Sequence, residues 1–229
     1  MITKLFKKFA QGIVNLYDGQ YGEVKKIFPS VETFHFVAKA FFKYDTEGFY
    51  YIDPITNFGY LFIKGTDKPA DWISNFVLCG RKIPYPGVNP KLRVHTGFSE
   101  GYILIQEWFL DTFKNCETLY IIGHSRGCPI ACLAALDVQF NGYLKSENIF
   151  VMIEGCPRWA NKLLMESYER RIPNTFAFRK GLDIVCFIPP IIYSYFSKIY
   201  KIGKAAWPFP NSRDHYPMEY LKAMQDFKL

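Results

Sequence analysis

A Gly-X-Ser-X-Gly pentapeptide at residues 123–127 constrains the fold of this chain more than any other feature of its sequence. The apolar run Leu119–Ile122 precedes it, and a stretch rich in small side chains follows it. This pattern is typical of a buried parallel strand that turns sharply into a helix, with a serine at the apex of the turn. Glycines flank the serine because a Cβ atom would clash where the backbones approach so closely. We therefore predict a nucleophile at Ser125; the alternative is an ordinary tight turn.

The rest of the sequence alternates as expected for a single α/β domain spanning residues 1–229. Of the 229 residues, 49% are hydrophobic, and a chain of this size can bury roughly 70% of the surface that it exposes when unfolded. Helix-length segments separate short apolar runs, which indicates a mostly parallel sheet covered on both faces. We expect strands at 47–53 and 58–64, paired around 55–57, then at 119–122, 149–153, 175–178 and 184–188, and helices near 98–114, after 127, near 159–170 and after 215.

Charge and cysteine distribution argue against a nucleic-acid-binding or zinc-binding protein. The formal net charge is +7, but the 28 lysines and arginines are scattered and no basic run is interleaved with aromatic residues. The six cysteines show neither a Cys-X-X-Cys pair nor a regular spacing, so four zinc ligands at suitable separations are missing. We expect no nucleic-acid partner, no metal and no cofactor.

The N-terminal segment has the periodicity of an amphipathic helix. Its apolar residues recur at helical spacing, whereas its lysines fall largely on the other side. The apolar positions are Ile2, Leu5, Phe6, Phe9, Ile13 and Tyr17. Such a helix docks either on the protein's own core or on a membrane surface. With no secretory signal or membrane-spanning run apparent, we expect free thiols and a cytoplasmic location.

The choice of catalytic base follows from the order of residues along the chain. A serine hydroxyl becomes nucleophilic when an imidazole takes its proton and a carboxylate orients that imidazole. On a strand-to-helix turn of this kind, the order is serine, acid, histidine. His35, in an apparently helical pattern, and His95 both precede Ser125, and His124 adjoins it with its side chain directed away. His215 is therefore the candidate base; the alternative is a surface histidine near a helix start.

The candidate acid is Asp183, which follows an apolar run and the turn at Gly181. We expect its strand to lie beside the one that leads to Ser125, so that the carboxylate reaches the histidine. Asp137 lies too far along the helix after the serine, and Asp214 is adjacent to the histidine that it would have to face. The alternative for Asp183 is a plain turn aspartate.

Two hydrogen-bond donors are needed for the negative charge that develops on a carbonyl oxygen under attack. One is expected to be the backbone N–H of Arg126, directly after the candidate nucleophile. The second must come from a loop after an early strand, and Lys64-Gly65-Thr66 closes such a strand. Gly65 permits close backbone approach there, and Thr66 offers both an N–H and a hydroxyl.

Taken in order, these segments resemble the motifs of the fungal-type (class 3) lipases. The matching segments are Lys64–Thr66 with Asp71–Asn75 (Arg-Gly-Thr/Ser and Asp-Trp-X-X-Asn), Val94–Phe98 with Tyr102 (Val-His-X-Gly-Phe), Gly155–Arg158 with Asn161 (Gly-Ser-Pro-Arg-X-Gly-Asn), Asp183–Val185 with Pro189 and Pro190 (Asp-X-Val-X-X-X-Pro-Pro), and His215. They run from about residue 59 to 220 and leave residues 1–45 uncovered. The chain departs from the family pattern at Lys64, Cys128 and Ala160, but none of these changes removes a candidate catalytic group.

The resemblance implies an α/β-hydrolase fold, with a mostly parallel central sheet, helices on both faces and a short lid helix. It also implies a serine carboxylic-ester hydrolase that cleaves lipid or acylglycerol esters through an acyl-enzyme. By resemblance, Thr66 is an oxyanion donor and residues 72–77 form the lid. Trp72, Ile73, Phe76 and Val77 would present one apolar face to the substrate groove. Contact with a membrane or lipid interface is left open.

Several alternatives stay open at this point. One alternative is an inactive α/β-hydrolase scaffold that binds a ligand or a protein, although the presence of all three catalytic residue types argues against this. A peptidase or thioesterase is also compatible, since the catalytic groups do not select the leaving group. The lid segment is either mobile or a fixed surface helix. Aromatic residues that fit either an acyl groove or the core are Trp72, Phe76, Tyr85, Tyr193, Tyr195, Phe196 and Trp207.

Overall fold

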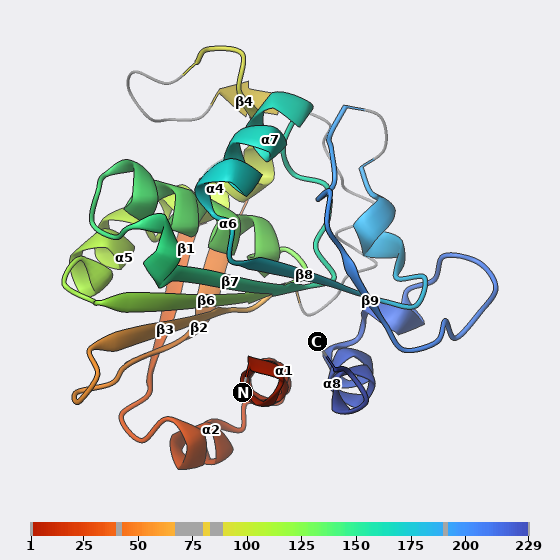
Figure 1. Cartoon of the computed structure of the whole chain (residues 1–229), viewed down its shortest axis with the longest axis horizontal. Coiled ribbons are helices and arrows are strands. Elements are labelled where there is room, and N and C mark those ends of the chain that lie inside the picture. Colours follow the sequence, from red (N-terminus) through yellow and green to blue (C-terminus); the bar gives the residue numbers. More distant parts are fainter. Residues whose placement is uncertain (1, 40–42, 67–79, 83–88, 190–191, 229) are drawn as a thin grey trace.

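A computed structural model of the chain describes residues 2–39, 43–66, 80–82, 89–189 and 192–228 (Figure 1). In this part of the chain, a seven-stranded sheet has the order β1-β2-β3-β6-β7-β8-β9. Its strands are β1 (Glu32–Lys39), β2 (Lys43–Ile52), β3 (Phe58–Ile63), β6 (Thr118–His124), β7 (Ile149–Glu154), β8 (Thr175–Lys180) and β9 (Tyr200–Ile202). Two further strands, β4 (Gly80–Lys82) and β5 (Arg93–His95), form a small antiparallel sheet.

The large sheet is parallel from β3 to β9 and antiparallel only at its β1–β2–β3 edge. The predicted hairpin between β2 and β3 is confirmed, with Ile52 opposite Gly59. Asp53 stabilises its turn because the carboxylate accepts the N–H groups of Ile55 and Thr56. The register that matters for function pairs Ile63 with Gly123 and His124 with Glu154, which aligns the ends of β3, β6 and β7.

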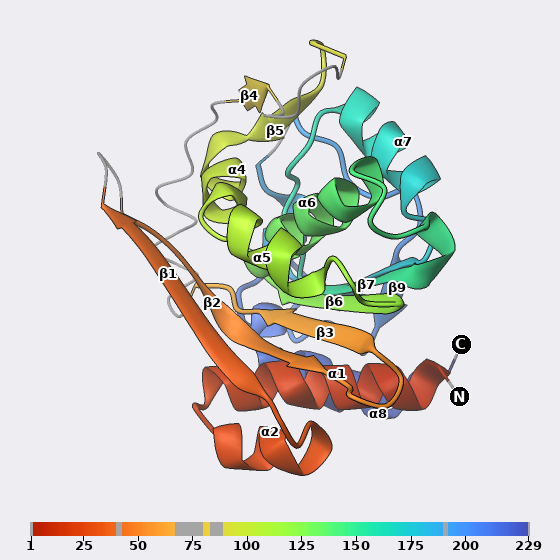
Figure 2. The ribbon, with the colours of Figure 1, turned by 90° about the vertical axis from the view of Figure 1, so that its left-hand side faces the viewer.

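Helices cover both faces of the large sheet, as Figure 2 shows from the side. One face carries α4 (Thr96–Ile103), α5 (Gln106–Phe113), α6 (Gly127–Phe140) and α7 (Lys162–Arg171), and the other carries α1 (Ile2–Tyr17), α2 (Tyr21–Ile27) and α8 (Pro217–Gln225). Short 3₁₀ helices lie at η1 (Ser146–Asn148), η2 (Ile184–Phe187) and η3 (Arg213–His215). Two apolar clusters, one under each layer, form the core. The predicted mostly parallel, doubly covered sheet of an α/β-hydrolase fold is therefore confirmed.

The amphipathic N-terminal segment forms α1 and docks on the protein's own core. Phe6, Phe9, Ala10 and Ile13 are all buried against the sheet. The helix also packs along α8, so the two chain ends lie side by side on this face (Figure 2). Of the two alternatives for this segment, core docking is the one that the structure shows. Among the described residues, no helix has the length and apolarity needed to cross a bilayer.

Three expectations about secondary structure were wrong. Residues 184–188 form the 3₁₀ helix η2 and its C-cap rather than a strand, because the Asp183 carboxylate accepts Val185 N–H and turns the chain. The expected helix over 98–114 is broken into α4 and α5. His35 lies in strand β1, where buried Phe34 alternates with exposed neighbours at the period of a strand. A short apolar run does not by itself distinguish these states.

Candidate active site

The predicted strand–turn–helix around Ser125 is confirmed. Strand β6 ends at His124, α6 begins at Gly127, and Ser125 between them has the left-handed φ of 55°. Its N–H donates to the carbonyl of Glu154 at 3.0 Å, which ties the turn to β7. A Cβ on Gly127 would lie 2.3 Å from the carbonyl oxygen of Ile63, so only glycine lets α6 start this close to β3. The turn thus holds a serine in a strained conformation at the carboxyl end of the sheet.

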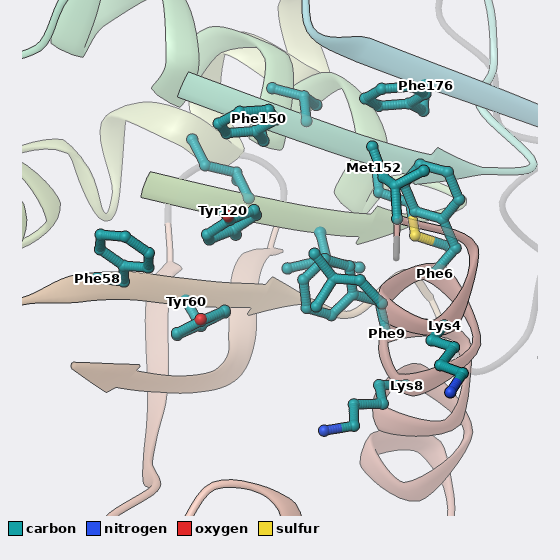
Figure 3. Close-up of a pocket in the computed structure, with 15 residues that line it drawn as sticks. Lys4, Phe6, Lys8, Phe9, Phe58, Tyr60, Tyr120, Phe150, Met152 and Phe176 are labelled. Carbon is teal, nitrogen blue, oxygen red and sulfur yellow. The ribbon is translucent and has the colours of Figure 1, made fainter. Parts of the chain in front are cut away.

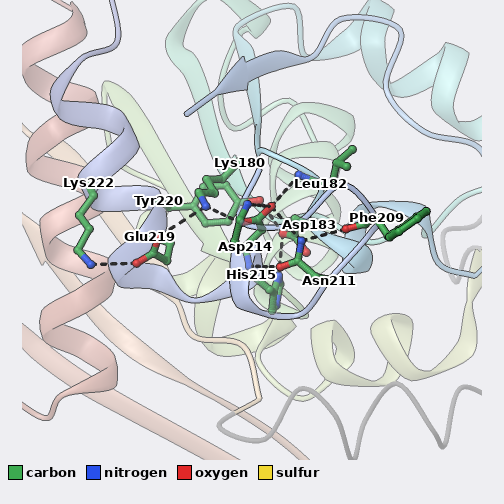
Figure 4. Close-up of polar contacts among 11 residues, drawn as sticks. Lys180, Leu182, Asp183, Phe209, Asn211, Asp214, His215, Glu219, Tyr220 and Lys222 are labelled. Atoms are coloured by element: carbon green, nitrogen blue, oxygen red, sulfur yellow. Dashed lines mark hydrogen bonds and ion pairs between the residues drawn. The ribbon is translucent and has the colours of Figure 1, made fainter. Parts of the chain in front are cut away.

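The structure brings Ser125, His215 and Asp183 into one chain of contacts. His215 Nε2 lies 2.8 Å from Ser125 Oγ, and His215 Nδ1 lies 2.8 Å from Asp183 Oδ2. All three side chains are buried. Because the carboxylate only accepts, Nδ1 carries the imidazole proton and Nε2 is left to accept the serine proton. Figure 4 shows Asp183 and His215 pointing toward each other from separate loops.

We expected Asp183 to follow the strand beside β6, and this expectation was wrong. Asp183 follows β8, and β7 lies between β8 and β6. The carboxylate reaches His215 because the chain after β7 leaves room at Gly155, whose φ is 67°. A Cβ there would lie 2.8 Å from both Asp183 Oδ2 and the His215 ring. The Asp183 carboxylate and the His215 ring therefore meet directly over this glycine.

Three donors keep Asp183 ionised although it is buried. They are His215 Nδ1, the Tyr220 hydroxyl at 2.6 Å and the Val185 N–H at 2.9 Å. Burial alone would raise the pKa of Asp183, but the neighbouring His215 and these hydrogen bonds hold it below its usual value. Tyr220 lies in α8 and was missed by the sequence analysis, since nothing local marks its hydroxyl as a partner of a residue 37 positions away.

The acids and the histidine that the sequence argument set aside have structural partners. Asp214 forms a buried ion pair with Lys180 and accepts the N–H groups of Leu182 and Ala206 (Figure 4). This cluster fixes the loop that carries His215 to the end of β8. Asp137 instead accepts hydrogen bonds from side chains of α4 and α5, and His95 caps α4 by accepting Gly97 N–H.

A second hydrogen-bond chain runs behind the catalytic contacts, and the sequence analysis did not foresee it. Tyr17 Oη lies 2.9 Å from His124 Nδ1, and His124 Nε2 lies 2.9 Å from the carbonyl oxygen of His215. That carbonyl can only accept, so His124 donates from Nε2 and accepts the Tyr17 hydroxyl at Nδ1. Tyr17 in turn accepts the N–H of Gly65 at 2.9 Å. Helix α1 thus connects the loop before Thr66 with the backbone of His215.

His124 keeps this tautomer because it stays neutral. Burial, with the nearby His215, lowers the pKa of His124 to about 3. The expected direction of its side chain, away from Ser125, agrees with the structure: it points toward Tyr17 and α8. Glu154, at the end of β7, is also neutral near pH 7, since burial raises its pKa to about 8.

Replacing Tyr17 with phenylalanine is expected to lower kcat by about tenfold with little change in KM, because Gly65 and His124 lose their shared partner and small displacements of catalytic groups slow the reaction. The loss of these two partly buried hydrogen bonds is also expected to lower stability by about 2 kcal/mol, roughly 1 kcal/mol for each. Steady-state kinetics and urea unfolding measure the two effects. Tyr21→Phe, on the exposed face of α2, is the matched control. An unchanged kcat with the same stability loss would make Tyr17 purely structural.

The segments that carry the two expected oxyanion donors, Thr66 and Arg126, both lie next to Ser125. Thr66 directly follows Gly65, on which a Cβ would come within 2.6 Å of Ser125 Cβ. The Arg126 side chain is turned away and held by Asp45 on β2, which leaves its backbone as the group beside the turn. Lys64, where the family usually has arginine, pairs with Glu47 at 3.1 Å. The roles of Thr66 and Arg126 as donors stay predictions.

The expected lid and groove residues Trp72, Ile73, Phe76 and Val77 lie outside the described residues, as do Tyr85 and the whole lid segment. Among the other aromatic candidates, Tyr193 and Phe196 are buried, and Phe196 belongs to the apolar core. Core packing is thus the correct alternative for Phe196. Trp207 is 61% exposed, so it belongs neither to the core nor to a closed groove.

This geometry defines the protein as a serine hydrolase with an α/β-hydrolase fold. A serine on a strained turn, an imidazole that accepts from it and a buried carboxylate behind the imidazole form the arrangement used for nucleophilic attack on acyl groups. Within the described residues, no group of three or more His, Cys, Asp or Glu side chains is placed to hold a metal ion.

The chain belongs to the class 3 lipase family, whose model matches residues 60–193. It is therefore a serine ester hydrolase. No curated protein matches the chain. The structure of Rhizomucor miehei triacylglyceride lipase is similar, with a TM-score of 0.72 and 21% identity over 93% of this chain and 92% of that one. A lipase from Rhizopus microsporus var. chinensis has a TM-score of 0.69 and 19% identity over 98% and 86%. At these identities the structural likeness shows the fold alone.

Proposed function

We propose that Ser125, His215 and Asp183 are the catalytic triad of a hydrolase acting on lipid esters. The observation that carries this proposal is the unbroken series of contacts from Ser125 Oγ through His215 to Asp183, with two distances of 2.8 Å. The series occurs in a member of the class 3 lipase family. An inactive scaffold is not favoured, because it would have no need to keep a strained serine and a buried carboxylate in hydrogen-bond contact with one imidazole.

The chemistry follows from the protonation states. His215 Nε2 removes the Ser125 proton as Oγ attacks the ester carbonyl, and the imidazolium that forms is stabilised by the ionised Asp183. The backbone N–H of Arg126 and a donor from Thr66 would hold the developing oxyanion, each contributing about 3 kcal/mol in comparable sites. His215 then protonates the leaving alkoxide. A water molecule, deprotonated by His215, then attacks the acyl-enzyme; the bond between the acyl carbon and Ser125 Oγ breaks, His215 returns the proton to Oγ, and the carboxylic acid is released.

Labelling by a fluorophosphonate probe combined with an ester series tests this function. We expect stoichiometric labelling, hydrolysis of p-nitrophenyl esters, and higher kcat/KM as the acyl chain lengthens from butyrate toward palmitate. Amide and thioester analogues of the same acyl group serve as comparators for a peptidase or a thioesterase. A preference for either analogue over the ester would contradict the proposal, and so would the absence of labelling of correctly folded protein.

Two exposed aromatic residues on the loop at 203–212, which precedes His215, are evidence for contact with a lipid interface. The loop presents Trp207 and Phe209, which are 61% and 74% exposed, and Figure 4 shows Phe209 pointing away from the ion-pair cluster. The loop is held in place because Asp214 accepts Ala206 N–H and Leu182 O accepts Asn211 N–H. Aromatic side chains on an anchored loop fit the boundary between headgroups and acyl chains. We propose that this loop docks the active site on lipid.

Changing Trp207 and Phe209 together to serine is expected to lower activity on an emulsified long-chain triglyceride by about tenfold, since two exposed aromatic side chains no longer partition into the interface. Activity on dissolved p-nitrophenyl butyrate is expected to stay within about twofold, because both side chains are largely exposed to solvent. The control is Ile55→Ser, which removes a 93% exposed apolar side chain at the β2–β3 turn. Equal losses on both substrates would show that the loop acts on catalysis instead.

A further inference from the structure

An apolar cavity of about 530 Å³ lies between α1 and the sheet, on the face opposite α6. Its volume is in the range of small-molecule sites, roughly 300–1,000 Å³. Figure 3 shows the helix as one wall and the aromatic side chains of the sheet as the floor. The cavity exists because α1 crosses the sheet at one side, with Phe6 and Phe9 buried. On this face, the aromatic side chains near the starts of β3, β6, β7 and β8 are only partly buried.

The floor is a row of stacked rings on neighbouring strands. Tyr60 and Tyr120 are parallel to within 8° with centroids 5.0 Å apart, and Tyr120 and Phe150 to within 20° at 5.1 Å. Phe176 closes one end against Phe6, with centroids 4.8 Å apart. This row of rings, which the protein buries only in part, is what an extended hydrocarbon chain would cover.

Two lysines border this floor on the side of α1. Lys4 and Lys8 both line the cavity and lie one helical turn apart on α1, and their side chains extend from the helix in different directions (Figure 3). Both are exposed, and neither forms an ion pair with another residue in the described part of the chain. An apolar cavity with two ammonium groups at its rim matches a ligand with a long hydrocarbon tail and an anionic head.

The cavity is separate from the catalytic centre. Tyr120 lies near the start of β6 and Phe150 near the start of β7, whereas Ser125 follows the last residue of β6. At about 3.3 Å per residue, Tyr120 and Ser125 are roughly 16 Å apart along the strand. Phe9 and Phe62 fill the space between, so the two sites do not form one groove.

We propose that this cavity, defined by α1 and the ring row of Tyr60, Tyr120 and Phe150, is a binding site for a long-chain fatty acid. The tail would lie on the ring row, and the carboxylate would pair with Lys4 and Lys8. A free fatty acid fits better than a whole membrane, because the site is a recess for a single chain rather than a protruding apolar surface. Binding does not depend on catalysis, although an ester hydrolase would release a ligand of this class.

Oleate binding by the full chain tests the proposal after treatment with diethyl p-nitrophenyl phosphate, which blocks a reactive Ser125. Isothermal titration is expected to give saturable binding of one oleate per chain. Reversing both charges, Lys4→Glu with Lys8→Glu, is expected to raise Kd by about tenfold or more, since two ion pairs become repulsions. The control, Lys25→Glu with Lys162→Glu, makes the same change in net charge at exposed positions elsewhere and is expected to leave Kd within about twofold.

Two further arms locate the ligand and identify its source. A diazirine-labelled fatty acid is expected to crosslink to peptides from α1 or from the starts of β6 and β7, whatever the variants do to affinity. The parent protein is expected to bind phosphatidylcholine vesicles, with or without phosphatidylserine, no better than the charge-reversed variant binds them. Absence of saturable oleate binding, crosslinks elsewhere, an unchanged Kd on charge reversal, or binding confined to anionic vesicles would each overturn the proposal. Failure of phosphorylation at Ser125 would count against the triad alone.

Discussion

Changing Ser125 to alanine is expected to lower kcat on p-nitrophenyl esters by roughly 10⁵–10⁶-fold while the protein stays folded. The loss is this large because the hydroxyl oxygen is the atom that bonds to the substrate, and among the described residues Ser125 Oγ is the group that lies in hydrogen-bond contact with His215 Nε2. The fold is retained because Ser125 is held by its backbone, through its N–H to Glu154. Kinetics, fluorophosphonate labelling and thermal unfolding measure the three consequences.

The matched control for this variant is Ser212→Ala. Ser212 lies in the same region, and its backbone carbonyl accepts the N–H of His215, but its side chain is exposed. We expect normal labelling and turnover from it. If Ser125→Ala were still labelled to the level of the parent protein, the nucleophile would be another residue and the triad assignment would be wrong.

The sequence alone was sufficient to bring together three residues that the structure places in contact, Ser125, Asp183 and His215, because local chemistry marks the first two and chain order selects the third. A strained turn requires glycines around Ser125, and the carboxylate at Asp183 follows a strand and a turn. Chain order then leaves His215 as the base. Neither the local features of Ser125 and Asp183 nor the chain order that selects His215 depends on knowing which strands are neighbours. The expected position of the Asp183 strand beside β6 does depend on that, and it was wrong.

The supporting residues could not be predicted in the same way. Tyr17 contacts His124 across 107 positions of sequence, and Tyr220 contacts Asp183 across 37. In the sequence both look like ordinary apolar-face residues of amphipathic helices, because packing and hydrogen bonding use the same side chain. Only the docking of α1 and α8 on one face of the sheet shows that their hydroxyl groups reach the catalytic loops.

These two tyrosines give the N-terminal and C-terminal helices a common position behind the triad. Tyr220 donates to the acid, and Tyr17 connects the loop before Thr66 with the carbonyl of the base through neutral His124. The buried ion pair of Lys180 and Asp214 fixes the loop that carries the base. Each catalytic group is thus held by partners that are themselves buried, which limits the reorganisation needed during the reaction.

Replacing Asp183 with asparagine is expected to lower kcat by about 10⁴-fold, the second-largest effect, without unfolding the protein. The amide retains the shape of the side chain but carries no charge, so it does not stabilise the imidazolium of His215. Its NH₂ group also donates, which favours the tautomer with the proton on Nε2 and prevents His215 from accepting the Ser125 proton. Tyr220→Phe removes only one of the three hydrogen bonds to the carboxylate and is expected to cost about tenfold.

The ratio between these two variants separates charge from geometry. If Asp183 acted only as a hydrogen-bonding spacer, asparagine and Tyr220→Phe would cause losses of similar size. We expect kcat of Asp183→Asn to be about 10³-fold lower than that of Tyr220→Phe, because charge on the acid is what stabilises the protonated base. Fluorophosphonate labelling is expected to slow in the same proportion. Labelling rates and kcat measured on protein with unchanged thermal midpoints test this. A loss below tenfold for Asp183→Asn would mean that another acid orients His215.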